Sequence, residues 1–134
     1  MQELMLNRKK NQNNKEVEVK PNNRRHDRHA AIWSIKGALL CKGQFQAISE
    51  NISSSGLLLK TPYQIKPGTK AHLRVSTFVA GKSHIIDAIV VFRHVSLSGS
   101  NYRCGAEFIR LNNGSKEFIQ RYINGKNPHE KDLV

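Results

Sequence analysis

Alternation of apolar and polar residues is the feature that most constrains this chain, and it recurs from about Ala30 to Phe108. In the stretch 71–76, Ala, Leu and Val alternate with His, Arg and Ser. A period of two is typical of a half-buried β-strand, because successive side chains point to opposite faces of the sheet. Glycine and proline interrupt the pattern at short intervals. Nothing between the strands has the length and period of a crossover helix, which argues against a parallel sheet.

Six strands are predicted from these runs and from the turns between them. Their ranges are 30–41 with a kink at Gly37, 43–51, 56–61, 71–76, 84–95 and 102–108. The run 84–95 is apolar on both faces, as expected for a strand that lines a barrel on one side and is covered on the other. We therefore predict an all-β fold: a six-stranded antiparallel (Greek-key) β-barrel with a short C-terminal α-helix.

The apolar period changes near the C-terminus, after the potential capping residues of the sequence NNGS. Phe118, Ile119, Tyr122 and Ile123 recur at helical spacing, so a short amphipathic helix is predicted over 112–123. We expect this helix to lie across the barrel or to plug one of its ends.

Three segments are expected along the chain. Residues 1–22 are rich in Asn, Gln, Lys and Glu, and they bury too little apolar surface to offset their ordering entropy, so a flexible polar leader is expected. The barrel domain with its helix is expected over 23–124, followed by a frayed tail over 125–134. The leader lacks the apolar core of a signal peptide, and no stretch approaches the roughly 18 apolar residues of a membrane span. A cytoplasmic protein without membrane contact is therefore expected.

The charge balance favours an anionic partner. The chain has 22 Lys and Arg against 10 Asp and Glu, a formal net charge of +12. The excess is spread along the chain, since residues 30–134 hold 14 Lys and Arg against 6 Asp and Glu, and spread charge is weak evidence for nucleic acid.

No metal site is expected. Cys41 and Cys104 lack zinc-ligand spacing, so reduced thiols are expected. Strand alternation places Asp87 on the opposite face from His84 and His94, which argues against a shared metal ion.

Two short motifs carry the candidate binding chemistry. The first is Arg24-x-x-x-Arg28, with Arg25 inside it, in the basic stretch NNRRHDRH. The second is NISSSG over 51–56, between the second and third predicted strands. Taken singly, the first is typical of a solvated leader. The second is typical of a tight turn with local hydrogen bonds and a glycine at positive φ.

The two motifs in this order, about two dozen residues apart and flanking the first strands of a β-barrel, resemble the PilZ domain family, whose pattern is RxxxR followed by (D/N)xSxxG. The later stretch YRCGAEF also resembles that family's closing strand. The resemblance covers about residues 23–123. It implies a bacterial receptor for the second messenger cyclic di-GMP, whose RxxxR segment lies on an N-terminal loop that the ligand bridges to the barrel.

The resemblance implies that cyclic di-GMP contacts Arg24, Arg28, Asn51, Ser53 and Gly56. An arginine guanidinium presents paired donors that match phosphate oxygens or the O6/N7 edge of guanine. The asparagine side chain would accept from guanine, and the serine hydroxyl would donate to a phosphate. The glycine would let the backbone turn closely beneath the ligand.

Four other residues are open to two interpretations each. Arg25, which we include in the predicted site, contacts a phosphate or faces water. Arg93 reaches the ligand from the barrel wall or is an exposed cation. Trp33 and Phe92 stack on guanine or pack in the core, which is the commoner fate of such residues. The motifs also leave open whether one ligand molecule binds or a stacked pair.

The sequence does not predict an enzyme or a cofactor. It lacks a nucleophile with a credible base, a paired carboxylate and a GxxxxGK[ST] phosphate loop. A loop that a ligand orders acts as a switch, so the output is expected through a protein partner. The alternative is a small basic barrel that binds single-stranded nucleic acid in the manner of an OB-fold. That function requires an aromatic stacking platform, whereas the aromatic residues here lie mostly at core-like positions.

Overall fold

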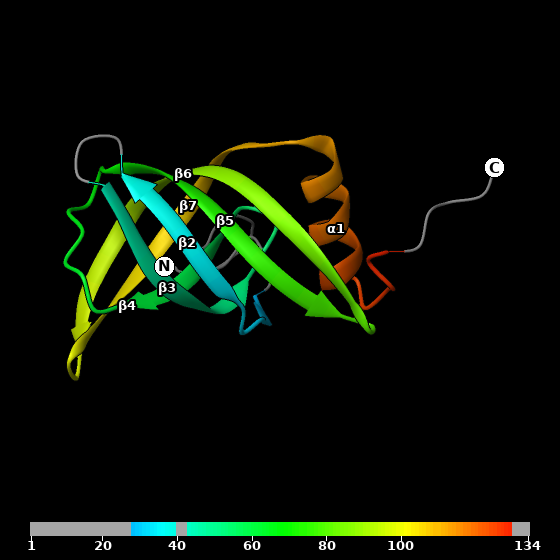
Figure 1. Ribbon diagram of the computed structural model, residues 1–134, viewed down its shortest axis with the longest axis horizontal. Helices are drawn as coiled ribbons and strands as arrows, with labels where there is room; N and C mark the ends of the chain where they lie inside the picture. Colours follow the sequence, from blue (N-terminus) through cyan, green and yellow to red (C-terminus); the bar gives the residue numbers. More distant parts are fainter. Residues whose placement is uncertain (1–27, 40–42, 130–134) are drawn as a thin grey trace, which may run out of the picture.

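The computed structural model describes residues 28–39 and 43–129. Its elements in chain order are β1 (His29–Ala30), β2 (Ser34–Leu39), β3 (Gly43–Ile52), β4 (Gly56–Thr61), β5 (Lys70–Val79), β6 (Lys82–Ser98), β7 (Asn101–Leu111) and α1 (Asn113–Ile123). The all-β prediction with one short C-terminal helix is confirmed (Figure 1). The predicted leader over 1–22 and the end of the tail, 130–134, lie outside the described residues.

Six strands close into a ring (Figure 1). The hydrogen-bonded order is β3-β2-β5-β6-β7-β4, and β4 pairs back to β3, with every pairing antiparallel. β2, β3 and β4 follow one another and β5 returns to lie beside β2, which is the Greek-key arrangement. The predicted count of six therefore holds for the ring, and β1 is an additional two-residue strand that pairs with the end of β3.

The first predicted strand, 30–41, differs most from the structure, because it is divided into β1 and β2. Inward and outward side chains still alternate across the break, with Ala31 and Trp33 both buried. The Ser49 hydroxyl on β3 accepts from the Trp33 N–H at 2.9 Å and donates to the Ala31 carbonyl. The register of β3 with β4 also shifts just after Ser49. The Ser49 side chain thus replaces part of the backbone hydrogen bonding between the two strands, and this interrupts the predicted strand between β1 and β2.

The predicted kink at Gly37 is absent. β2 runs through Gly37 with continuous pairing to β3 on one side and β5 on the other. The aromatic ring of Phe45, its partner on β3, lies over the glycine, and a Cβ at Gly37 would be 2.2 Å from Phe45 Cζ. The glycine therefore makes room for a core phenylalanine, which is a packing role.

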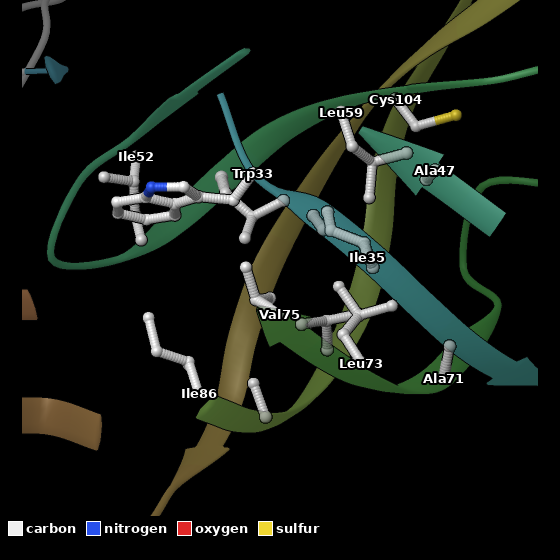
Figure 2. Packing of buried hydrophobic residues seen from close by; sticks show 14 of the residues in the cluster. Trp33, Ile35, Ala47, Ile52, Leu59, Ala71, Leu73, Val75, Ile86 and Cys104 are labelled. Atoms are coloured by element: carbon white, nitrogen blue, oxygen red, sulfur yellow. The ribbon is translucent and has the colours of Figure 1, made fainter. Parts of the chain in front are cut away.

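Inward-facing side chains from all six ring strands fill the core. β5 shows the predicted alternation most clearly, since Ala71, Leu73 and Val75 are buried between exposed neighbours. Figure 2 shows Leu73 and Val75 gathered near Ile35 of the adjacent β2. Cys104 belongs to the same core, and its burial raises the pKa of its thiol to about 11. At neutral pH this cysteine is therefore a protonated, apolar core residue.

The helix α1 lies at one end of the ring, beside the β5–β6 hairpin (Figure 1). It begins as predicted in the sequence NNGS, where the Asn112 side chain accepts from the Ser115 N–H at 2.7 Å. Phe118 and Ile119 on α1 are buried in the core. Within the described residues, no helix combines the length and the apolar character that crossing a membrane requires.

The helix is also tied to the chain segment that leads into β2. The indole of Trp33 packs against the rings of Phe118, at 6.3 Å between centroids, and Tyr122, at 5.0 Å. The Tyr122 hydroxyl donates to the carbonyl of Ala30 at 2.6 Å. The N-terminal side of the barrel and the C-terminal helix are therefore held together by both aromatic packing and a hydrogen bond.

Candidate functional site

The structure places Arg28 directly beside Asn51. β1 pairs with the end of β3, with His29 opposite Ile52 and Ala30 opposite Asn51. This register puts the preceding residue, Arg28, at the end of β3, where its Nη1 donates to Asn51 Oδ1 at 3.1 Å. The second arginine of the first motif thus meets the first residue of the second motif, and Arg28 is exposed to solvent there.

The NISSSG turn is held by its own hydrogen bonds. The Ser53 N–H donates to the Gly56 carbonyl at 2.8 Å, which closes the turn between β3 and β4. The Ser53 hydroxyl accepts from the Ser55 N–H at 3.3 Å and lies 3.2 Å from the Ser55 hydroxyl. Ser53 is 5% exposed. In this structure its hydroxyl therefore organises the turn.

Gly56 is needed for a reason that the sequence did not indicate. The positive φ that is typical of such a turn taken singly is not found, since Gly56 is not among the positive-φ glycines. A Cβ at this position would instead lie 2.2 Å from the carbonyl oxygen of Ala106 on β7. The neighbouring Phe108 N–H donates to the Ser55 carbonyl at 2.9 Å, which draws β7 against the turn. Only glycine allows the two backbones to come this close.

A second arginine, Arg93, flanks the turn from β6, the strand that pairs with the other edge of β7. Arg93 lies on β6 where the register with β7 shifts between Phe92 and His94. Its Nε donates to Glu107 Oε1 at 2.7 Å, and Glu107 is the β7 partner of Gly56. Neither motif indicates Arg93, because only the irregular β6–β7 pairing brings it there. It is more than half exposed, so its guanidinium is accessible beside the turn.

The remaining candidates divide into three groups. Arg24 and Arg25 lie outside the described residues. Trp33 and Phe92 are core residues, 7% and 0% exposed, so they offer no ring face to a guanine. Among the described residues, no three His, Cys, Asp or Glu side chains gather as metal ligands would.

The histidines considered for metal binding have other contacts. His84 stacks on Phe118 with 4.5 Å between ring centroids, and Asp87 pairs with Arg74 and His72 on the outer face of β5 and β6. Burial lowers the pKa of His84, and the nearby His129 lowers it further. His84 is therefore a structural residue, whose neutral imidazole packs on Phe118 where β6 contacts α1.

A closed antiparallel ring with an arginine and an asparagine joined at its rim defines a small β-barrel domain with a polar surface site. The family model of the PilZ domain matches residues 22–125, so the chain belongs to the PilZ domain family. A search of curated proteins gives no significant match. The resemblance read from RxxxR and NxSxxG is therefore confirmed at the level of the family.

Solved structures share the fold. The inhibitor of motility MotI/DgrA of Bacillus subtilis superposes with a TM-score of 0.67 at 15% identity, covering 81% of this chain and 56% of that one. The chain thus spans little more than half the length of MotI. The PilZ domain of YcgR from Escherichia coli, solved with c-di-GMP, has a TM-score of 0.62 at 15% identity, covering 78% and 91% of the two chains. The structure of Escherichia coli YcgR in complex with c-di-GMP has a TM-score of 0.62 at 17% identity, covering 77% of this chain and 45% of that one.

Proposed function

We propose that this protein is a cyclic di-GMP receptor of the PilZ type and not an enzyme. The observation that carries the proposal is the 3.1 Å contact between Arg28 and Asn51, which joins the two motifs at one place on the barrel rim. Membership of the PilZ domain family supports it, and so do the structures of YcgR, which contain c-di-GMP. The ligand would bind where the arginine segment meets the turn.

The chemistry of these residues suits a ligand with two phosphates and two guanines. Arg28 is exposed, so its guanidinium can turn from Asn51 to a phosphate or to a guanine O6/N7 edge. Asn51 Oδ1 accepts one hydrogen bond from Arg28, and an amide oxygen has a second lone pair for a guanine N–H. The Ser53 and Gly56 interactions hold the turn in the shape that presents Asn51.

The proposed mechanism is a switch. Arg24, Arg25 and Arg28 would close on the ligand, so that binding energy is used to fix the arginine segment against β3 and the turn. A downstream protein partner would then recognise the changed surface. We further propose that the protein acts in the cytoplasm, where it would bind no resident cofactor and no nucleic acid.

Isothermal titration with cyclic di-GMP tests the proposal. The native chain should bind with micromolar or tighter affinity and respond little to GMP. Arg28→Ala should nearly abolish the heat, a loss of at least about tenfold in affinity, because a charge-assisted pair of hydrogen bonds is removed. Ser53→Ala should weaken binding less, through the turn.

Arg110→Ala is the matched control, since Arg110 is an exposed arginine on β7 outside both motifs. It should bind as the native chain does. No heat from the native chain, together with salt-sensitive binding of a single-stranded oligonucleotide, would replace the receptor proposal with the nucleic-acid alternative.

A further inference from the structure

A groove of about 1050 Å³ runs over the outer face of β2, β3 and β4 and the start of β7. Three large apolar side chains line it while remaining exposed to solvent: Ile32 (76%), Ile48 (53%) and Tyr63 (53%). Isolated exposed apolar residues are ordinary, but several that gather in one hollow indicate an interaction surface. The proposed contacts of the RxxxR and NxSxxG motifs use none of the three.

Three of the four charged residues that line the groove are cationic. Lys36 from β2, Lys60 from β4 and Arg103 from β7 line it together with one carboxylate, Glu50. That carboxylate lies 3.1 Å from Arg103 Nε and 3.7 Å from Lys60 Nζ, so its charge is already offset within the groove. Lys36 has no acidic partner among the described residues. The groove therefore combines an apolar floor with an excess of positive charge.

These features restrict the kinds of molecule that could bind in the groove. An added β-strand is disfavoured, because most of the strand backbone beneath the groove already pairs on both sides, and within the described residues the open edge there is limited to the part of β3 before Ile48, which pairs with β2 alone. A second copy of the chain is disfavoured, because residues 28–39 and 43–129 hold 13 Lys and Arg against four Asp and Glu, and such surfaces repel each other. The groove fits a segment that supplies apolar side chains to its floor and carboxylates to its cations.

We propose that this groove docks an acidic, amphipathic segment of a partner protein, in which Leu, Ile or Phe side chains stand beside Asp and Glu. Ile48 at the centre of β3 and Tyr63, which follows β4 and also lines the groove, would be the apolar anchors. Lys36, Lys60 and Arg103 would bind the carboxylates at the rim. Contacts between side chains, and not between backbones, would select the partner.

The groove adjoins the proposed nucleotide site, and this part of the inference rests on the proposed receptor function. Glu50 of the groove directly precedes Asn51, and the Ala31 N–H donates to the Glu50 carbonyl at 3.0 Å. Ile32 follows Arg28 by four residues. A ligand that moves Arg28 would therefore move one end of the groove, so the nucleotide would change the affinity for the partner segment.

Peptide selection followed by direct binding tests the inference. A random peptide display library is selected on the full chain, and binding of the enriched peptides is measured by fluorescence anisotropy. Enriched peptides should combine Asp or Glu with Leu, Ile or Phe. Ile48→Asp should weaken their binding by at least about tenfold, since it places a carboxylate on the apolar floor. Lys36→Glu, at an exposed position that folding tolerates, should also weaken it several-fold.

Ile109→Asp is the matched control, because Ile109 is an isoleucine on a ring strand with 50% exposure, close to the 53% of Ile48, but outside the groove. It should leave peptide binding unchanged. Ile48→Asp should still bind cyclic di-GMP in the titration, which separates failure of the groove from failure of the receptor function. Four outcomes would each overturn the inference. The selection enriches no peptides, the enriched peptides show no acidic bias, or their binding does not depend on Ile48. The fourth is Ile48-dependent binding of the chain to vesicles containing phosphatidylglycerol.

Discussion

Under the proposed function, the single amide oxygen of Asn51 would have two hydrogen-bond donors to share. In the structure it accepts from Arg28, and in the proposed complex it would also accept from guanine. An aspartate at this position would have two carboxylate oxygens for the same tasks. In the proposed complex, the contact with Arg28 would place the arginine near the ligand before binding, but it would also engage the oxygen that is to accept from guanine.

The role of Gly56 gives a stability prediction. Gly56→Ala should lower the free energy of unfolding by about 1–3 kcal/mol, because the new Cβ would overlap the Ala106 carbonyl and push β7 from the turn. Urea denaturation followed by circular dichroism measures the change. Gly105→Ala is the control on β7, where the nearest atom to a new Cβ is 3.8 Å away. Equal stability of both variants would contradict the close-approach argument.

The resemblance carried by the two motifs led us to expect Arg28 and Asn51 at one ligand site, and the structure places these two side chains in contact. The motifs did not indicate the surroundings of these residues. The reason for Gly56 depends on Ala106, which is distant in sequence and reaches the turn only through β4–β7 pairing. The motifs also did not indicate Arg93, because only the pairing of β6 with β7 brings it beside the turn. Tertiary pairing, and not local pattern, supplies these neighbours.

Among the elements, the strands were predictable where alternation was uninterrupted, as in β5. The division into β1 and β2 was not, because inward-facing apolar residues continue through Ala31 and Trp33. What interrupts the ladder is the hydroxyl of Ser49, a polar residue at an inward position of β3. A serine there gives a weak sequence signal, since nothing local shows which backbone groups it binds.

The contact of α1 with β6 gives a pH prediction. The pKa of His84 is lowered by burial first and by His129 second, and its Nε2 has no hydrogen-bond partner in the part of the chain that the structure describes. A lowered folded-state pKa means that the unfolded state binds the proton more readily. This contribution to stability is therefore complete above the ordinary pKa of about 6.5 and is lost as the pH falls.

Urea denaturation between about pH 7.5 and 5.5 measures this effect. The native chain should lose more stability over that interval than His84→Phe, which keeps a ring on Phe118 but cannot be protonated. His94→Asn, at an exposed histidine on the same strand, should follow the native profile. If His84→Phe shows the native slope, His84 is not the group responsible.

At the scale of the whole molecule, ring closure makes each of the six ring strands depend on two neighbours. β4 closes the ring, and its Leu59 is fully buried with Cys104 of β7 as its cross-strand partner. Leu59→Ala should cost about 2–5 kcal/mol. The loss should appear as a single transition with the same midpoint by circular dichroism and by tryptophan fluorescence.

Leu97→Ala, at a leucine with 70% exposure on β6, is the control and should change stability by less than about 0.5 kcal/mol. Two separate midpoints in the Leu59→Ala variant would show that part of the ring unfolds independently. The closed pairing order would then not be what makes folding cooperative.

The packing of Trp33 has a practical consequence. It is the single tryptophan of the chain, it follows Arg28 by five residues, and its indole lies against Phe118 and Tyr122 of α1. The emission of one fluorophore therefore senses both the segment that carries the arginine and the helix at the opposite terminus of the chain. The protein contains its own optical probe, so ligand titrations and helix undocking can be followed in real time without a label.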